Sequence, residues 1–243
     1  MYTLEVIAFD IASCGIIQRN GAHRIELCQG PAEGGTTPSQ GFIKAARQQT
    51  SIQLYPIIRP RGGDFLYSAE EFNMMRSDVL LCKSLGCDGV VLGILTADGQ
   101  VDQARCSRLV ELAYPMGVTF HRAFDRVTDA ATALEAVIDC GFERILTSGL
   151  RPDAIAGADT IADLIQKADD RIIIMPGSGV RSGNIAAVAA QTGAVEFHTS
   201  ARLLKNTEMT YQNPAMQEQL QHATIDEAEL RKTLEALAGI QSN

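Results

Sequence analysis

The sequence predicts a single (β/α)8 barrel, in which eight parallel strands are each followed by a helix. Short runs of β-branched residues alternate eight times with segments of helical composition, which is the pattern of a parallel sheet covered by helices. The 243 residues match the length of such barrels, about 250 residues. After the first expected strand, Asp10–Cys14 lacks the glycine-rich fingerprint of a doubly wound nucleotide-binding sheet.

Eight segments have the length and composition of strands. They are residues 4–9, 24–28, 53–59, 89–95, 117–123, 144–149, 171–177 and 195–201. Ser68 precedes a helical segment and Glu71 follows three residues later, which is a capping-box pattern. A last helix is expected at about 224–238. The segment 202–223 is predicted to be a long irregular loop at the C-terminal mouth, and no composition shift divides 1–243 into two domains.

Composition excludes several classes of function. The net charge of −8 and the pI near 5.0 argue against a nucleic-acid partner or an anionic membrane surface. The N-terminus lacks a basic leader, and no apolar run approaches the roughly 20 residues that span a bilayer. Six cysteines occur without a CxxC pair, which indicates free thiols. We therefore expect a cytoplasmic protein.

Several strands are expected to turn polar side chains toward the barrel interior. Strand residues alternate between the interior and the helix layer, so Arg24, Glu26 and Cys28 share the inward face of one strand. A buried charge without a partner costs several kcal/mol, so these positions predict a polar mouth that carries function. The candidate acid, base and anion-contacting residues are Glu26, Arg59, Arg61, Asp64, His121, Asp125 and His198.

The stretch from Arg59 to Asp64 has two interpretations. Two guanidinium groups beside flexible glycines suit an anion site at the end of a strand. The alternative is an internal ion-pair network, with Arg59 on Glu26 and Arg61 on Asp64 or Asp125. The two are compatible, because such a network can support a site.

A second candidate anion site follows the seventh and eighth expected strands. Many barrels bind phosphate at these loops, and here the candidates are Gly177, Ser178, Gly179 and the backbone near Ser200. The alternative is that the glycines only allow a tight turn. No lysine lies on a strand end, which argues against a Schiff-base aldolase.

A metal site is a further hypothesis. Glu26, His121 and His198 make a set of two histidines and one carboxylate, with Cys28 as a soft neighbour. Histidines at strand ends also serve as general bases or as hydrogen-bonded structural residues, so these alternatives stay open.

Seven blocks of the sequence resemble the copper homeostasis protein CutC family. They are RIELC (24–28), EGGTTPS (33–39), PIIRPRGGDFLYS (56–68), VTFHRAFD (118–125), RILTSG (144–149), MPGSGV (175–180) and EFHTSA (196–201). The resemblance implies a (β/α)8 barrel, a cytoplasmic location, a homodimer or homotetramer, and a role in copper homeostasis with Cu(I) binding. Family members often carry cysteine where this chain has Ile7, so Cys28 is the one candidate thiolate ligand at that place.

Two function hypotheses follow. The first is a copper homeostasis protein that binds Cu(I) through Cys28. The second is a barrel enzyme on a small phosphorylated or carboxylated metabolite, in which Arg59 and Arg61 hold the anion and Glu26 or His121 is the general acid/base. Segment 202–223 carries apolar residues that a second subunit or the barrel mouth would have to cover. They are Leu203, Leu204, Met209, Tyr211 and Met216.

Overall fold

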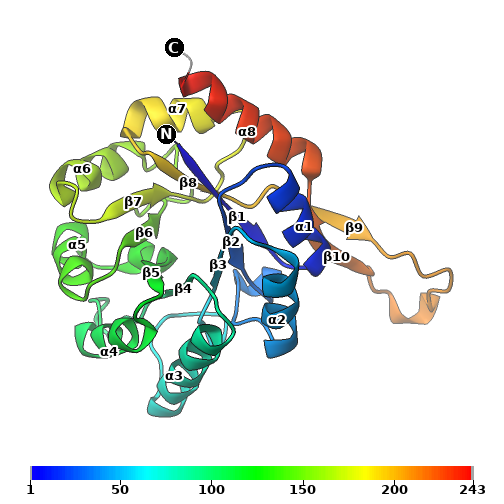
Figure 1. Ribbon diagram of the computed structural model, residues 1–243, viewed down its shortest axis with the longest axis horizontal. Helices are drawn as coiled ribbons and strands as arrows, with labels where there is room; N and C mark the ends of the chain where they lie inside the picture. Colours follow the sequence, from blue (N-terminus) through cyan, green and yellow to red (C-terminus); the bar gives the residue numbers. More distant parts are fainter. Residues whose placement is uncertain (1, 242–243) are drawn as a thin grey trace.

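A computed structural model describes residues 2–241 and shows a closed ring of parallel strands inside a ring of helices (Figure 1). The barrel strands are β1 (Thr3–Ala8), β2 (Arg24–Leu27), β3 (Gln53–Pro56), β4 (Gly89–Leu92), β5 (Gly117–Phe120), β6 (Arg144–Thr147), β7 (Ile173–Pro176) and β8 (Glu196–Thr199). The helices are α1 (Ile11–Arg19), α2 (Gln40–Gln49), α3 (Ala69–Ser84), α4 (Gln103–Ala113), α5 (Ala130–Asp139), α6 (Ala158–Ala168), α7 (Ile185–Thr192) and α8 (Glu227–Gln241).

The ring consists of two four-stranded parallel sheets, ordered β3-β2-β1-β8 and β4-β5-β6-β7. A parallel bridge between Ile57 and Val91 joins β3 to β4, and β7 lies beside β8 on the other side. The predicted (β/α)8 barrel is therefore confirmed. The carboxyl ends of the strands form one mouth, which is where barrels build their sites.

The alternation of strand residues separates two apolar regions. Leu4, Val6, Ile25 and Leu27 face the helices and belong to the large core between strands and helices. A much smaller cluster on the inner face contains Cys28, Tyr55, Ile57 and Val91, with Ile7 and Phe9 packed against it. The remaining inner positions of β1, β2 and β8 are polar, as the sequence predicted.

Side-chain caps fix where the helices begin. The Asp10, Ser39, Asp102 and Asp129 side chains each accept a hydrogen bond from a backbone N–H in the first turn of the helix that follows. Ser68 and Glu71 form the predicted capping box at the start of α3.

The strands β3, β4 and β5 end about three residues earlier than predicted, because the chain leaves the ladder to build the mouth. The Arg59 N–H, for example, donates to the Thr37 hydroxyl at 2.9 Å instead of to a neighbouring strand. The last helix begins at Glu227, three residues later than predicted. Among residues 2–241, no helix combines the length and the apolar character needed to cross a bilayer.

The prediction of an irregular loop at 202–223 was wrong. The segment forms an antiparallel hairpin of β9 (Arg202–Asn206) and β10 (Gln221–Ile225) that projects from the side of the barrel (Figure 1). All five residues of β9 are exposed, so the sequence shows none of the burial alternation that marks a strand. Backbone pairing between the two strands sustains the hairpin.

Candidate functional site

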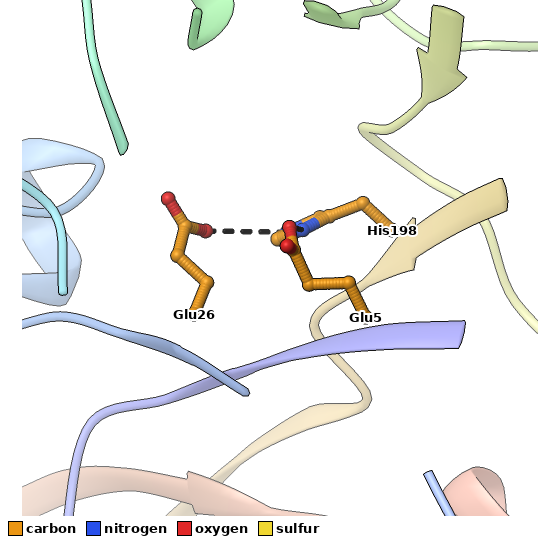
Figure 2. A group of neighbouring side chains, drawn as sticks. All are labelled: Glu5, Glu26 and His198. Atoms are coloured by element: carbon orange, nitrogen blue, oxygen red, sulfur yellow. Dashed lines mark hydrogen bonds and ion pairs between the residues drawn. The ribbon is translucent and has the colours of Figure 1, made fainter. Parts of the chain in front are cut away.

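Three buried side chains from adjacent strands meet inside the barrel. Glu5 on β1 lies opposite His198 on β8, and Glu26 on β2 is one step closer to the mouth. Figure 2 shows the His198 ring between the two carboxylates. Its Nδ1 is 2.8 Å from Glu5 Oε1, and its Nε2 is 3.6 Å from Glu26 Oε2. One ligand atom from each residue lies within 4.8 Å of the others.

A layer of ion pairs lies next to this centre, on the side away from the barrel mouth. Arg24 bonds both Glu5 and Glu196, the latter at 2.6 Å, and Arg144 Nε bonds Glu196 at 2.6 Å. The Tyr55 ring lies within 6 Å of both guanidinium groups. Glu143 is a further partner of Arg144 at 2.8 Å, so two guanidinium groups meet three carboxylates in this layer.

Glu5 is a fixed anion of that layer. Burial by itself would raise its pKa, but the Arg24 charge and the hydrogen bond with His198 lower the pKa to about 2. Glu5 therefore orients His198 through Nδ1 and leaves Nε2 directed toward Glu26.

Glu26 has the opposite electrostatic situation. It is 3% exposed, and no arginine of residues 2–241 forms an ion pair with it. Burial therefore raises its pKa to about 7, although the His198 and Arg24 charges oppose this. Burial disfavours the charged imidazole, yet Glu5 and Glu26 together raise the pKa of His198. Glu26 and His198 are thus two adjacent groups whose pKa values are both raised, an arrangement typical of sites that use acid/base chemistry.

Arg59 lies at the mouth but its donors are directed to the backbone. The guanidinium donates to the carbonyl oxygens of Glu33, Gly35 and Gly63 at 2.6, 2.8 and 3.0 Å. It lies 4.9 Å from the centre of the Phe65 ring. Arg59 therefore ties the loop after β2 to the loop after β3, and does not pair with Glu26.

Arg61 is also engaged within its own loop. Its Nε is 2.6 Å from Glu71, and Nη2 is 2.9 Å from Asp64 and 2.7 Å from the carbonyl oxygen of Leu66. The Asp64 side chain is 70% exposed. The geometry of Arg61 corresponds to the internal-network interpretation of the Arg59–Asp64 stretch.

His121 makes different contacts from His198. Its Nδ1 accepts a bond from the Ala123 N–H at 3.3 Å, and its ring packs 4.8 Å from that of Phe65. Burial and the Arg59 charge lower the pKa of His121 to about 3, so the ring is neutral and carries its proton on Nε2. In the described chain, the metal-type cluster contains Glu5, Glu26 and His198 and does not include His121.

Asp125 is the centre of a hydrogen-bond knot that joins the loops after β5 and β6. Its carboxylate accepts from Arg122 Nε at 2.7 Å, from the Ser148 N–H at 2.9 Å, and from the Thr147 hydroxyl. It also accepts from the Leu150 N–H at 3.2 Å. These contacts indicate that Asp125 holds the loops after β5 and β6 together.

The loop after β7 uses many of its polar groups internally. The Gly177 N–H donates to the Thr147 carbonyl at 2.9 Å, and the Ser178 hydroxyl donates to the Pro152 carbonyl at 2.9 Å. A Cβ at Gly177 would lie 2.4 Å from Leu146 Cδ1, so a larger residue there would require the leucine side chain to shift. Ser200 is half-buried at the end of β8.

The surroundings of Cys28 do not fit Cu(I). Burial and the neighbouring Glu26 and Glu5 charges raise the pKa of the thiol well above its usual range, whereas Cu(I) binds the thiolate. Ile7 packs nearby and supplies no donor. The cluster of Glu5, Glu26 and His198 offers carboxylate oxygens and one imidazole, a donor set suited to a divalent ion rather than to soft Cu(I).

The fold and this centre define the class of protein: a (β/α)8 barrel with a buried carboxylate–histidine pair below its mouth. The model of the CutC family matches residues 2–203, which include all eight barrel strands. This chain belongs to the CutC family.

Similar proteins and a solved structure also support membership of the CutC family. A CutC protein of Chromobacterium violaceum is 56% identical over 199 residues, covering 82% of this chain and 81% of its own. A human protein named copper homeostasis protein cutC homolog is 44% identical over 215 residues, covering 88% and 79%. The crystal structure of a CutC protein from Streptococcus agalactiae matches with a TM-score of 0.78 and 34% identity, covering 82% and 98%.

Sequence reasoning found Glu26 and His198 but missed the contribution of Glu5. The two-residue alternation of a strand places Glu5 on the inward face of the first strand, yet no motif marks it. Its role follows from the β1–β8 register, which sets it opposite His198. A carboxylate in an otherwise apolar first strand was the available signal.

Proposed function

We propose that this chain serves in copper homeostasis. The observation that supports the proposal is membership of the CutC family across the whole barrel, together with human and mouse relatives that carry the copper homeostasis name. Family membership supports the role without specifying which atoms meet copper.

A deletion strain of the source organism, complemented with the full chain, tests this role. We expect deletion to change total cell copper or growth at high copper, and the intact chain to restore both. An empty vector and an unrelated barrel protein are the controls. Equal copper content and equal growth in all strains would contradict the proposal.

A second candidate function is a barrel enzyme that uses general acid/base chemistry on a small anionic metabolite. One observation favours it: Glu26 has a pKa near 7 and lies next to a histidine that Glu5 holds in place. In this proposal Glu26 and His198 transfer a proton to and from the substrate. A pocket of about 680 Å³ lies between the loops after β1 and β2 and the hairpin, and Asp10, Arg202 and His222 help to line it.

Untargeted mass spectrometry of a small-molecule extract tests the enzyme candidate. The wild-type chain is expected to consume one anionic metabolite, and Glu26→Gln is expected to abolish that change. His23→Gln is the matched control, because His23 lies outside the barrel centre and bonds the Leu4 N–H. An extract that wild type leaves unchanged, or changes as Glu26→Gln does, would argue against acid/base catalysis at this pair.

We further propose a cytoplasmic homodimer or homotetramer. All six cysteines are free and buried, which supports a reducing compartment. Large apolar side chains on the hairpin are exposed, among them Leu204 at 62%, Met209 at 63% and Tyr211 at 70%. A second subunit that covers them would remove this surface from water.

A further inference from the structure

Three buried polar groups near the barrel mouth have no hydrogen-bond partner. In the part of the chain that the structure describes, they are Arg59 Nε, His121 Nε2 and the Tyr67 hydroxyl. Nearly all buried polar atoms of native proteins have a partner, so each exception calls for a physical reason. Here all three exceptions belong to the segments that follow β3 and β5, and a ligand that contacts them would supply that reason.

The Phe65 ring contacts two of the three groups. Its centre lies 4.9 Å from the guanidinium carbon of Arg59 and 4.8 Å from the centre of the His121 ring. The Tyr67 hydroxyl is next to Arg59: burial raises the pKa of Tyr67 to about 12, and the nearby guanidinium opposes this rise. The phenol is therefore protonated at neutral pH. Arg59, Tyr67 and His121 form one group of donors, which we term the mouth cluster.

His121 contributes a neutral N–H donor in a fixed position. Its Nδ1 accepts a hydrogen bond from the Ala123 N–H at 3.3 Å, so the ring proton is on Nε2. The backbone at Gly93 packs against the ring, because a Cβ there would lie 2.7 Å from Nδ1. These contacts on the Nδ1 side hold the ring and leave the Nε2–H for an acceptor from outside the chain.

Arg59 contributes a buried positive charge without a counter-ion. The residue is 5% exposed, and its guanidinium donates to three backbone carbonyl oxygens. No carboxylate in the described part of the chain forms an ion pair with it, because the nearby Asp64 and Glu71 pair with Arg61. A buried charge is costly unless a group of opposite sign accompanies it. Water can accept from the donors of the mouth cluster, but only an anion balances the charge of Arg59.

We propose that the mouth cluster binds the carboxylate group of a substrate, an inference that rests on the second candidate function, the barrel enzyme. One guanidinium charge matches the single negative charge of a carboxylate. The two carboxylate oxygens can accept from His121 Nε2, Arg59 Nε and the Tyr67 hydroxyl. A phosphate monoester carries a charge of about −1.5 to −2 at pH 7 and would exceed the one cation. The cluster therefore favours a carboxylated substrate over a phosphorylated one.

The Phe65 ring controls access to the mouth cluster in this proposal. One side of the half-buried ring contacts Arg59 and His121, and the residue also lines a cavity of about 450 Å³ with Leu95 and Arg126. Rotation of this one side chain would connect the cavity with the buried donors. A carboxylate that enters from the cavity would then replace the ring as the neighbour of the guanidinium.

Nuclear magnetic resonance of the full wild-type chain, labelled with nitrogen-15 in histidine, tests the subsite with acetate as the probe. His121 is recognised among the four histidines because its pKa of about 3 keeps its signals those of a neutral ring between about pH 5 and 8. Acetate is expected to shift the His121 Nε2 signal saturably. Acetamide has the same shape without the charge and should cause no such shift, and phosphate at equal ionic strength should bind more weakly than acetate.

The wild type alone can overturn the proposal. An absent saturable shift with acetate, an equal shift with acetamide, or tighter binding of phosphate than of acetate would each do so.

A conservative variant tests the hydroxyl donor. Tyr67→Phe removes one hydrogen bond to a charged group and is expected to weaken acetate binding about tenfold. Tyr114→Phe is the matched control, because Tyr114 is 77% exposed, and it should bind acetate as the wild type does. Circular dichroism shows whether both variants are folded. Equal acetate affinity in a folded Tyr67→Phe variant would contradict the mouth cluster.

Failure of the subsite and failure of the barrel enzyme give different results. Acetate binding at His121, together with an extract that the wild type leaves unchanged, would refute the enzyme and leave the subsite standing. Glu26-dependent consumption of a metabolite that has no carboxylate would refute the subsite and leave the enzyme standing.

Discussion

The wild-type protein is expected to lose stability between about pH 5 and 8, and replacing Glu26 by glutamine is expected to abolish most of that loss. Burial raises the pKa of Glu26 from 4.5 to about 7 in the folded protein. Between these values the unfolded chain releases the proton and the folded chain keeps it, so stability falls as pH rises. At about 1.4 kcal/mol per pH unit, the loss reaches about 3 kcal/mol once the folded carboxyl is ionised. His198 acts with the same sign, because its pKa is also raised.

Urea unfolding at pH 5, 6, 7 and 8 measures this effect. The wild-type midpoint should fall with pH, whereas the Glu26→Gln midpoint should fall much less, with the remaining fall due to His198, and should exceed the wild type at pH 8. Glu5→Gln is the contrasting control: the pKa of Glu5 is lowered to about 2, and losing its charge leaves Arg24 short of a partner. That variant should be less stable by roughly 3 kcal/mol above pH 5. A wild-type midpoint independent of pH, or a Glu26→Gln variant weakened most at pH 8, would refute the reasoning.

Two further outcomes are expected. Asp125→Asn should lower the free energy of unfolding by roughly 3 kcal/mol, because an amide cannot accept all the hydrogen bonds that converge on this buried carboxylate. Urea denaturation measures the change. A variant as stable as the wild type would contradict the structural role assigned to Asp125. Light scattering should give a multiple of 26.2 kDa for the wild type, and Leu204→Glu with Tyr211→Glu on the hairpin should reduce it to the monomer. Leu80→Glu, at a half-exposed leucine of α3, should not; a wild-type monomer would contradict the oligomer.

The barrel was predictable because its signals are local. Each strand run and each helix cap is determined by residues a few positions apart, as Ser68 and Glu71 show. The inward position of Glu26 followed from the two-residue period of a strand. The partnership of His198 with Glu5 did not, because it depends on the register between β1 and β8, strands that are almost 200 residues apart in the chain.

The mouth was harder to predict, because an arginine has several donors and the sequence does not say which acceptors reach them. Arg59 was expected to meet an anion or Glu26, yet three backbone carbonyls surround it.

The surroundings of Glu26 also indicate why a carboxyl group occupies this position in the barrel centre. The ion-pair layer on the side away from the mouth needs no further anion, since Arg24 and Arg144 already meet Glu5, Glu196 and Glu143. An ionised Glu26 therefore neutralises no fixed cation and lowers stability near neutral pH. A group that costs about 3 kcal/mol when charged and adjoins a titrating histidine has a physical use in holding or delivering a proton. Packing alone would be served as well by glutamine, and this difference is what the pH dependence of the Glu26→Gln variant isolates.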